Sequence, residues 1–141
     1  MDPLVEAAIN GLRQQFDEWR DLFLNHAHRG YDQTKVLPTS RFQLKDAASI
    51  SANVSLADHF YVTLEGNRTL ENPIQPRDGQ YIIFEIIQDG TGSRTITLGS
   101  KFVAGPFTIT LSTTADERDF IECRYSKIDD KFYIVNFTKG Y

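Results

Sequence analysis

The sequence is poor in cysteine and in long apolar runs, and it carries no surplus of positive charge. Cys123 is the only cysteine among 141 residues, which excludes an internal disulfide and a zinc site built on cysteines. No apolar run approaches the roughly 18 residues that span a bilayer, and the first residues lack the basic and apolar regions of a signal peptide. Lys and Arg total 15 against 19 Asp and Glu, which argues against nucleic-acid binding. We therefore expect a soluble, mildly acidic protein made in a cytoplasm, with no nucleic-acid or membrane partner.

Aromatic residues are plentiful, at 12% of the chain, and such residues suit pleated surfaces. From about Ser49 the apolar residues alternate with a period of two, and Gly, Pro, Asn and Asp separate the short apolar runs. No internal repeat at solenoid or propeller period is visible. The pattern predicts a mainly β fold, an antiparallel sandwich or barrel. The strands are expected near residues 50–56, 60–64, 80–88, 94–98, 108–111, 119–125 and 132–137.

A single long helix is predicted over residues 2–25, because Asp2 can cap it and Pro3 suits its first position. Its apolar positions are spaced alternately by four and three residues, which is a heptad seam. The seam consists of Val5, Ile9, Leu12, Phe16, Trp19 and Phe23. Such a stripe either packs on the β core of the same chain or associates with other copies. Bulky aromatic residues in the seam fit a trimeric bundle better than a tight dimer.

Three regions follow from these patterns: an N-terminal helix over residues 1–28, a linker over residues 29–48 and a β domain over residues 49–141. The boundary rests on a helix-stopping Gly30 and on Pro38, which disfavours helix at the preceding residue.

His26 and His28 are the one candidate metal pair. In extended backbone, residues i and i+2 face the same way, and His26 continues the heptad seam. In a parallel trimer about six imidazoles would then face one axis, which suits a divalent transition metal. The alternative is a solvent-exposed pair stabilised at the negative end of the helix dipole.

We expect no enzymatic activity. The stretch Asp89-Gly90-Thr91-Gly92 lacks the Lys and the following helix of a phosphate-binding loop, so a tight hairpin between two strands is predicted. The carboxylates of residues 116–122 alternate along a strand and do not obviously converge. Cys123 is expected to behave as a small core residue.

Several motifs in the C-terminal half resemble a module of bacteriophage virion proteins. They hold their order and spacing over about 80 residues, and they read VTLEGNRTLENP (62–73), RDGQ (77–80), QDGTGSRTIT (88–97), GSKF (99–102), TLSTTA (110–115) and KGY (139–141). Upstream, the segment His26-x-His28-x-Gly30-x-Asp32 is similar to one that recurs in phage trimers.

The resemblance implies a structural protein of the virion that works as a homotrimer. Because the helix is short for a fibre, a capsid decoration (cement) protein that binds the assembled major capsid protein is the first expectation. The alternative is a tail fibre, tail adaptor or receptor-binding component that contacts the host surface.

Overall fold

The computed structural model describes the backbone of residues 2–30 and 40–141, and the side chains of residues 2–18 and 40–141. The chain divides into two units, Met1–Pro38 and Thr39–Tyr141. Each unit is described by itself below.

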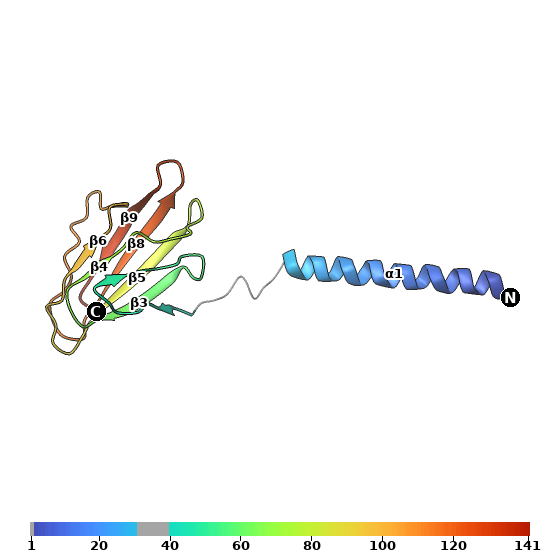
Figure 1. Cartoon of the computed structure of the whole chain (residues 1–141), viewed down its shortest axis with the longest axis horizontal. Coiled ribbons are helices and arrows are strands. Elements are labelled where there is room, and N and C mark those ends of the chain that lie inside the picture. The colour runs from blue at the N-terminus through green and yellow to red at the C-terminus, as the bar shows by residue number, and fades with distance from the viewer. Residues whose placement is uncertain (1, 31–39) are drawn as a thin grey trace. The chain divides into compact units, whose positions relative to one another are not determined.

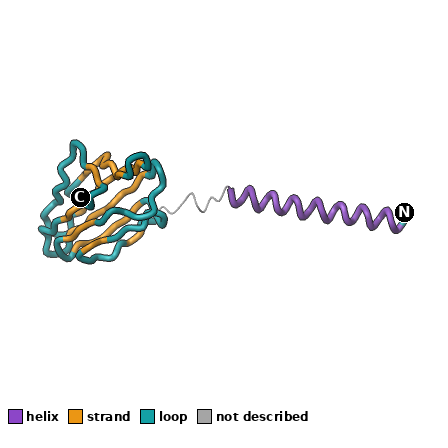
Figure 2. Tube along the Cα trace, turned by 45° about the horizontal axis from the view of Figure 1, so that its top comes forward, coloured by secondary structure: helices purple, strands orange, loops and turns teal. Residues whose placement is uncertain are grey.

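The first unit contains helix α1 (Pro3–Gly30), a continuous helix in Figure 2. It begins where the sequence predicts, because Asp2 Oδ1 accepts a hydrogen bond from the Leu4 amide at 2.9 Å and so caps the first turn. The helix extends through Gly30, so residues 26–28 have helical backbone rather than the extended backbone assumed for the histidine pair. Positions two residues apart on a helix lie on different faces. The geometry argued for His26 and His28 therefore does not apply to this backbone.

The second unit is a β body with two sheets, visible in Figure 1. The larger sheet has the strand order β1-β3-β5-β8-β9-β7 and the smaller one has the order β2-β4-β6. The strands are β1 (Phe42–Gln43), β2 (Ser49–Ile50), β3 (His59–Leu64), β4 (Arg68–Leu70), β5 (Tyr81–Gln88), β6 (Ile96–Leu98), β7 (Phe102–Val103), β8 (Arg118–Ser126) and β9 (Lys131–Thr138).

The first six strands alternate between the two sheets, and every pairing among them is parallel. The chain thus winds as in a parallel β-helix, with one strand per sheet in each turn. The antiparallel pairings are those of β8 with β5 and of β8 with β9. Strand β7 is parallel to β9.

The body is mainly β, as expected, but the expected antiparallel pairing is wrong, because the sheets are mixed. The predicted hairpin at residues 89–92 is wrong too, since the turn leads from β5 in the larger sheet toward β6 in the smaller one. The residues Glu65-Gly66-Asn67 likewise carry the chain from β3 in one sheet to β4 in the other. The segment 108–111 is not a strand, although Leu111 is buried. Strand β1 lies within the range expected to be linker, and β4 and β7 were not expected.

Because the strands of successive turns are parallel and in register, residues of the same kind lie above one another. Phe42, Phe60 and Phe84 are register partners on β1, β3 and β5, and their ring centroids are 5.9 Å and 5.7 Å apart. Phe102 joins this ladder, 6.1 Å from Phe84 and 5.5 Å from Phe132.

In the smaller sheet, Ile50, Leu70 and Leu98 form an equivalent apolar row. Except for Phe42, which is exposed at the edge of the larger sheet, the residues of both rows belong to or pack on one hydrophobic core. Successive turns differ in length, since Phe42 pairs with Phe60 but Phe60 pairs with Phe84. This unequal length explains why the winding leaves no sequence repeat.

Candidate binding surface

The motif asparagines stabilise the winding. Asn67 and Asn72 flank β4, and their Oδ1 atoms accept hydrogen bonds from the amides of Thr95 at 3.0 Å and Lys101 at 2.8 Å. Those two amides flank β6, the next strand of the smaller sheet. Each asparagine therefore holds one end of the following turn of the chain.

The motif glutamines hold the two ends of β5. Gln88 is buried, its Nε2 donates to the carbonyls of Arg94 and Ser112, and its Oε1 accepts from the Arg94 amide at 2.9 Å. Gln80 is also buried, and its Nε2 donates to the Val54 carbonyl at 2.7 Å. A buried amide with satisfied partners specifies the position of the backbone it contacts. These motif residues are structural.

The glycine-rich turn after β5 is closed by its own carboxylate. Asp89 Oδ1 accepts hydrogen bonds from the amides of Thr91 and Gly92, and Asp89 Oδ2 forms an ion pair with Arg94 at 2.9 Å. The Arg94 guanidinium and these amides lower the pKa of Asp89 to about 2. Because Asp89 occupies the amides that a phosphate would need, this turn is not a phosphate cradle.

The carboxylates of β8 lie on opposite faces of the sheet. Asp119 faces inward and accepts hydrogen bonds from the amide and hydroxyl of Ser112, both at 2.7 Å, and from the Gly140 amide. Glu122 faces outward and accepts a hydrogen bond from Asn136 at 2.8 Å. The two do not form the facing acid pair that glycoside hydrolysis requires.

Cys123 is buried among core residues, as the sequence predicts. Burial raises the pKa of its thiol to about 12, so the reactive thiolate form is suppressed.

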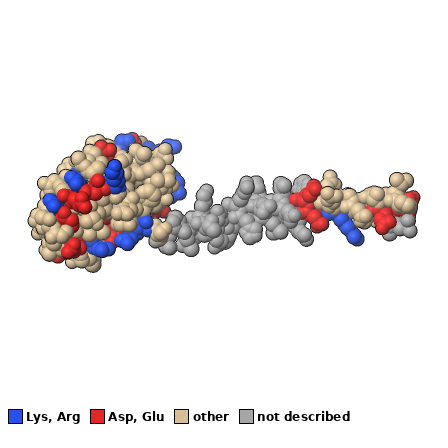
Figure 3. All heavy atoms as spheres, turned by 60° about the horizontal axis from the view of Figure 1, so that its bottom comes forward, with Lys and Arg blue, Asp and Glu red and all other residues tan. Residues whose placement is uncertain are grey.

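The outer face of the larger sheet, which is the face opposite the shared core, gathers charged and aromatic side chains. Glu85 is at its centre, in register with Tyr61 on β3 and Phe120 on β8. Its side chain is only 3% exposed. Arg41 Nη1 lies 2.9 Å and Arg118 Nη1 lies 2.5 Å from its carboxylate oxygens. On the face of the body shown in Figure 3, Asp and Glu gather in patches with Lys and Arg beside them.

Two further contacts complete this Glu85 cluster. His59 Nε2 lies 3.1 Å from Glu85 Oε2, and the Arg41 guanidinium stacks over Tyr61 at 4.5 Å from the ring centroid. Burial disfavours the charged carboxylate, but the hydrogen bonds from Arg41, Arg118 and His59 outweigh it and lower the pKa of Glu85. The carboxylate is therefore ionised and fully engaged by its neighbours.

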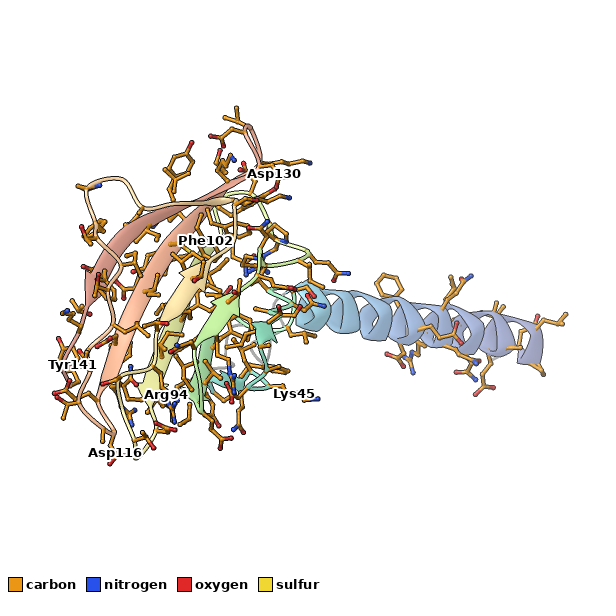
Figure 4. The ribbon with its side chains drawn as sticks, turned by 60° about the vertical axis from the view of Figure 1, so that its left-hand side comes forward. Lys45, Arg94, Phe102, Asp116, Asp130 and Tyr141 are labelled. Atoms are coloured by element: carbon orange, nitrogen blue, oxygen red, sulfur yellow. The ribbon has the colours of Figure 1, made fainter. Side chains whose placement is uncertain are left out.

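A second group lies on the same face, toward the turn between β8 and β9. Tyr81, Arg124 and Tyr133 are register partners across β5, β8 and β9. Figure 4 marks this end of the hairpin by Asp130, whereas Tyr141 lies at the opposite end. Register partners share one face of a sheet, so the three side chains form a single exposed row, here named the tyrosine–arginine row.

A β-bulge brings Asn136 to this face. Cys123 pairs with Ile134, but Glu122 pairs with Asn136, which leaves Val135 as an extra residue on β9. Without the bulge, residues 133 and 136 would point to opposite faces. The bulge therefore places the Glu122–Asn136 pair beside the tyrosine–arginine row.

Comparison with protein-family models matches residues 49–125, more than half of the chain, to the family described as "Putative phage tail fibre C-terminal domain". The chain belongs to this family. Neither the curated proteins nor the solved structures give a match. The membership supports the resemblance to phage virion proteins, and the chain is a phage structural protein with other virion components as partners. The match does not extend to a capsid decoration type.

The family match covers the Glu85 cluster only in part, because Arg41 precedes residue 49. Tyr133 and Asn136 lie beyond residue 125, so the tyrosine–arginine row is also only partly inside the matched region. In the described part of the chain, no helix combines the length and hydropathy needed to cross a membrane.

Four of the predicted interface residues have described side chains, and none of the four is buried within the first unit. Val5, Leu12 and Phe16 are 50% to 78% exposed, and Ile9 is 37% exposed. The side chains of Trp19, Phe23, His26 and His28 lie outside the described residues. No group of metal-binding side chains occurs in the part of the chain that the structure describes, and the histidine site stays a prediction.

The sequence analysis did not predict the Glu85 cluster or the tyrosine–arginine row on the outer face of the larger sheet. One signal was available, because Glu85 is a lone charge in the run Tyr81–Gln88, which is otherwise largely apolar. The row of Tyr81, Arg124 and Tyr133 had no comparable signal, since it depends on the pairing of three strands.

Proposed function

We propose that this chain is a component of the phage tail fibre, and that its β body forms the part of the protein that contacts other molecules. The family match over residues 49–125 carries the proposal. The outer face of the larger sheet supports it, because exposed aromatic side chains lie there beside charged ones.

A capsid decoration role, suggested by the short helix, is the second candidate. A decoration protein bridges neighbouring capsid subunits with a flat polar surface, whereas a tail component that contacts the host presents grouped aromatic and carboxylate side chains. The tyrosine–arginine row and Glu122 fit the description of a tail component better.

The proposal includes a homotrimer held by the N-terminal helices. The apolar seam of α1 supports it, because apolar residues spaced alternately by four and three residues form one stripe along the helix. An amphipathic helix of this kind is stabilised by burying its stripe. Packing of the helix on the β body of the same chain is the competing arrangement.

We propose a binding role without catalysis. Glu85 and Asp119 are the buried carboxylates of the described residues, and neighbouring side-chain or backbone groups engage both oxygens of each. A carboxylate held in this way is a poor candidate for proton transfer to a substrate.

Antibody labelling of the parent virion, followed by electron microscopy, tests the location. We expect the label at the tail, at the fibres or their attachment site. Label distributed over the capsid faces would overturn the tail assignment and support the decoration role. A cryo-electron reconstruction would then show which end of the chain contacts its neighbours.

A further inference from the structure

The tyrosine–arginine row presents two aromatic rings on either side of a guanidinium. Tyr81 and Tyr133 are 36% and 40% exposed. They lie on strands separated by β8, so their backbones are about 10 Å apart. The Arg124 guanidinium stacks over the Tyr81 ring, 5.4 Å from its centroid. The row therefore offers accessible ring faces with a cation between them.

Arg124 differs from the other arginines of this face. Arg41 and Arg118 both donate to the buried Glu85 carboxylate. Arg124 forms no ion pair and donates no side-chain hydrogen bond to any residue in the described part of the chain. Its stacking on Tyr81 orients the planar guanidinium and leaves the donors of its edge for a ligand.

Hydrogen-bond acceptors lie next to the tyrosine–arginine row, on Glu122 and Asn136. Glu122 accepts from Asn136 Nδ2 at 2.8 Å, which leaves the Asn136 carbonyl as an acceptor. Partial burial and a hydrogen bond to Glu122 raise the pKa of Tyr81. The surface thus combines two aromatic platforms, one cation and several acceptors within three neighbouring strands.

We propose that the tyrosine–arginine row binds an acidic saccharide chain. The C–H face of a pyranose ring packs on Tyr133, a carboxylate of the sugar accepts two hydrogen bonds from Arg124, and sugar hydroxyls donate to Glu122 and Asn136. A planar carboxylate matches the fork of a guanidinium. Aromatic rings bury apolar area at low cost in side-chain entropy.

The composition of the row favours a saccharide over a protein. Tyr and Arg are enriched at protein interfaces too, but the centre of such an interface is apolar and poor in Glu, whereas Glu122 and Asn136 lie beside Arg124 here. Val135, 44% exposed, is the one aliphatic side chain of β9 that is exposed beside it. The inference names a ligand class for the β body and rests on the tail role proposed above.

Isothermal titration of the full chain with carboxylate-bearing oligosaccharides tests the proposal. The probes are hexamers of galacturonate and of mannuronate together with sialylated oligosaccharides, and maltohexaose is the neutral comparison. We expect at least one acidic probe to bind more tightly than maltohexaose. The variants Arg124→Gln and Tyr133→Ala should each weaken that binding at least tenfold.

The matched control is Tyr141→Ala, which removes a tyrosine that is 69% exposed at the opposite end of the sheet. It should leave the affinity unchanged, and circular dichroism confirms that all three variants are folded. Absence of binding to every acidic probe overturns the proposal, and so does equal binding by the Arg124→Gln variant. A phage protein retained by the wild-type chain and lost in Arg124→Gln, with no saccharide bound, would assign the row to a protein contact instead. Tail labelling of the virion is independent of all these outcomes, so the two proposals can fail separately.

Discussion

Asp89 illustrates how one residue stabilises a turn of this domain. Its carboxylate accepts two backbone amides and an arginine within the five residues that follow it. These partners favour the charged form, which is why the folded-state pKa lies at about 2 and not at 3.8.

A pH dependence follows from this depressed pKa. The stabilisation by Asp89 is fully present well above pH 3.8, the ordinary pKa, and is lost as the pH falls through about 2. We expect Asp89→Asn to lower the midpoint of urea unfolding at pH 7. The difference between the midpoints of the variant and the wild type should shrink from pH 4 to pH 2, because the Asp89 carboxylate becomes protonated there. Glu71→Gln, at an exposed carboxylate, is the control. A gap as large at pH 2 as at pH 7 would contradict this account.

Other single residues were partly predictable. The burial of Cys123 follows from alternation along its strand, and the structure confirms it. The role of Glu85 was not predictable, because burying a carboxylate is favourable only with charged partners beside it. Those partners come from β3, from β8 and from the residue before β1, far apart in the sequence.

At the scale of elements, the winding depends on close contact between successive turns. Gly99 follows β6 and its amide donates to the Leu70 carbonyl on the neighbouring strand at 2.8 Å. A Cβ at Gly99 would lie 2.4 Å from Asn72 Oδ1 and 2.7 Å from the Asn72 amide nitrogen. Asn72 itself holds the Lys101 amide, so it cannot move without releasing the next turn.

We expect Gly99→Ala to destabilise the body by about 1–3 kcal/mol, as overpacking of a well-packed site does. Urea denaturation, monitored by far-ultraviolet circular dichroism, measures this loss in the free energy of unfolding. The matched control is Gly90→Ala, where a Cβ would meet nothing within 4 Å. That change should be neutral, or stabilising by up to about 1 kcal/mol, because Ala reduces the conformational entropy of the unfolded chain. Equal effects of the two substitutions would show that the turns are not in tight contact at Asn72.

At the scale of the whole molecule, the first question is how many chains associate. We expect the purified protein to sediment as a trimer rather than as a monomer of 16.1 kDa. Changing Phe16 and Trp19 together to Lys should dissociate it, because the seam would then bury unpaired charges. Sedimentation equilibrium at micromolar concentration measures both.

The control for that experiment places the same two charges on the polar face of the helix, as Gln14→Lys with Gln15→Lys. This variant should remain a trimer. A wild-type chain that sediments as a monomer would reject the bundle and favour a helix that packs within its own chain.

The histidine pair gives a second prediction for the assembled molecule. If His26 and His28 bind a transition metal on the trimer axis, elemental analysis of untagged protein should find about one metal per three chains. His28→Ala should lose the metal, and so should wild type below the imidazole pKa of about 6.5. Absence of metal after incubation with zinc and nickel would show that the pair is only a polar helix end.

The sequence by itself determined the helix, the β character of the body and the places where the chain turns. These features depend on local chemistry: Asp2 caps the helix, and alternating apolar residues can bury one face of a strand. The motif asparagines and glycines could be read as turn residues for the same reason.

Only the tertiary structure decided where each strand goes after its turn. The residues Glu65-Gly66-Asn67 permit a hairpin and a crossing to a second sheet equally well. What selects the crossing is the stacking of Phe42, Phe60 and Phe84 on one side and of the apolar residues of the smaller sheet on the other. The tyrosine–arginine row depends on the same kind of long-range pairing, together with the bulge at Val135. Contacts between residues distant in sequence carry no local signal, and they decided both the parallel winding and the candidate binding surface.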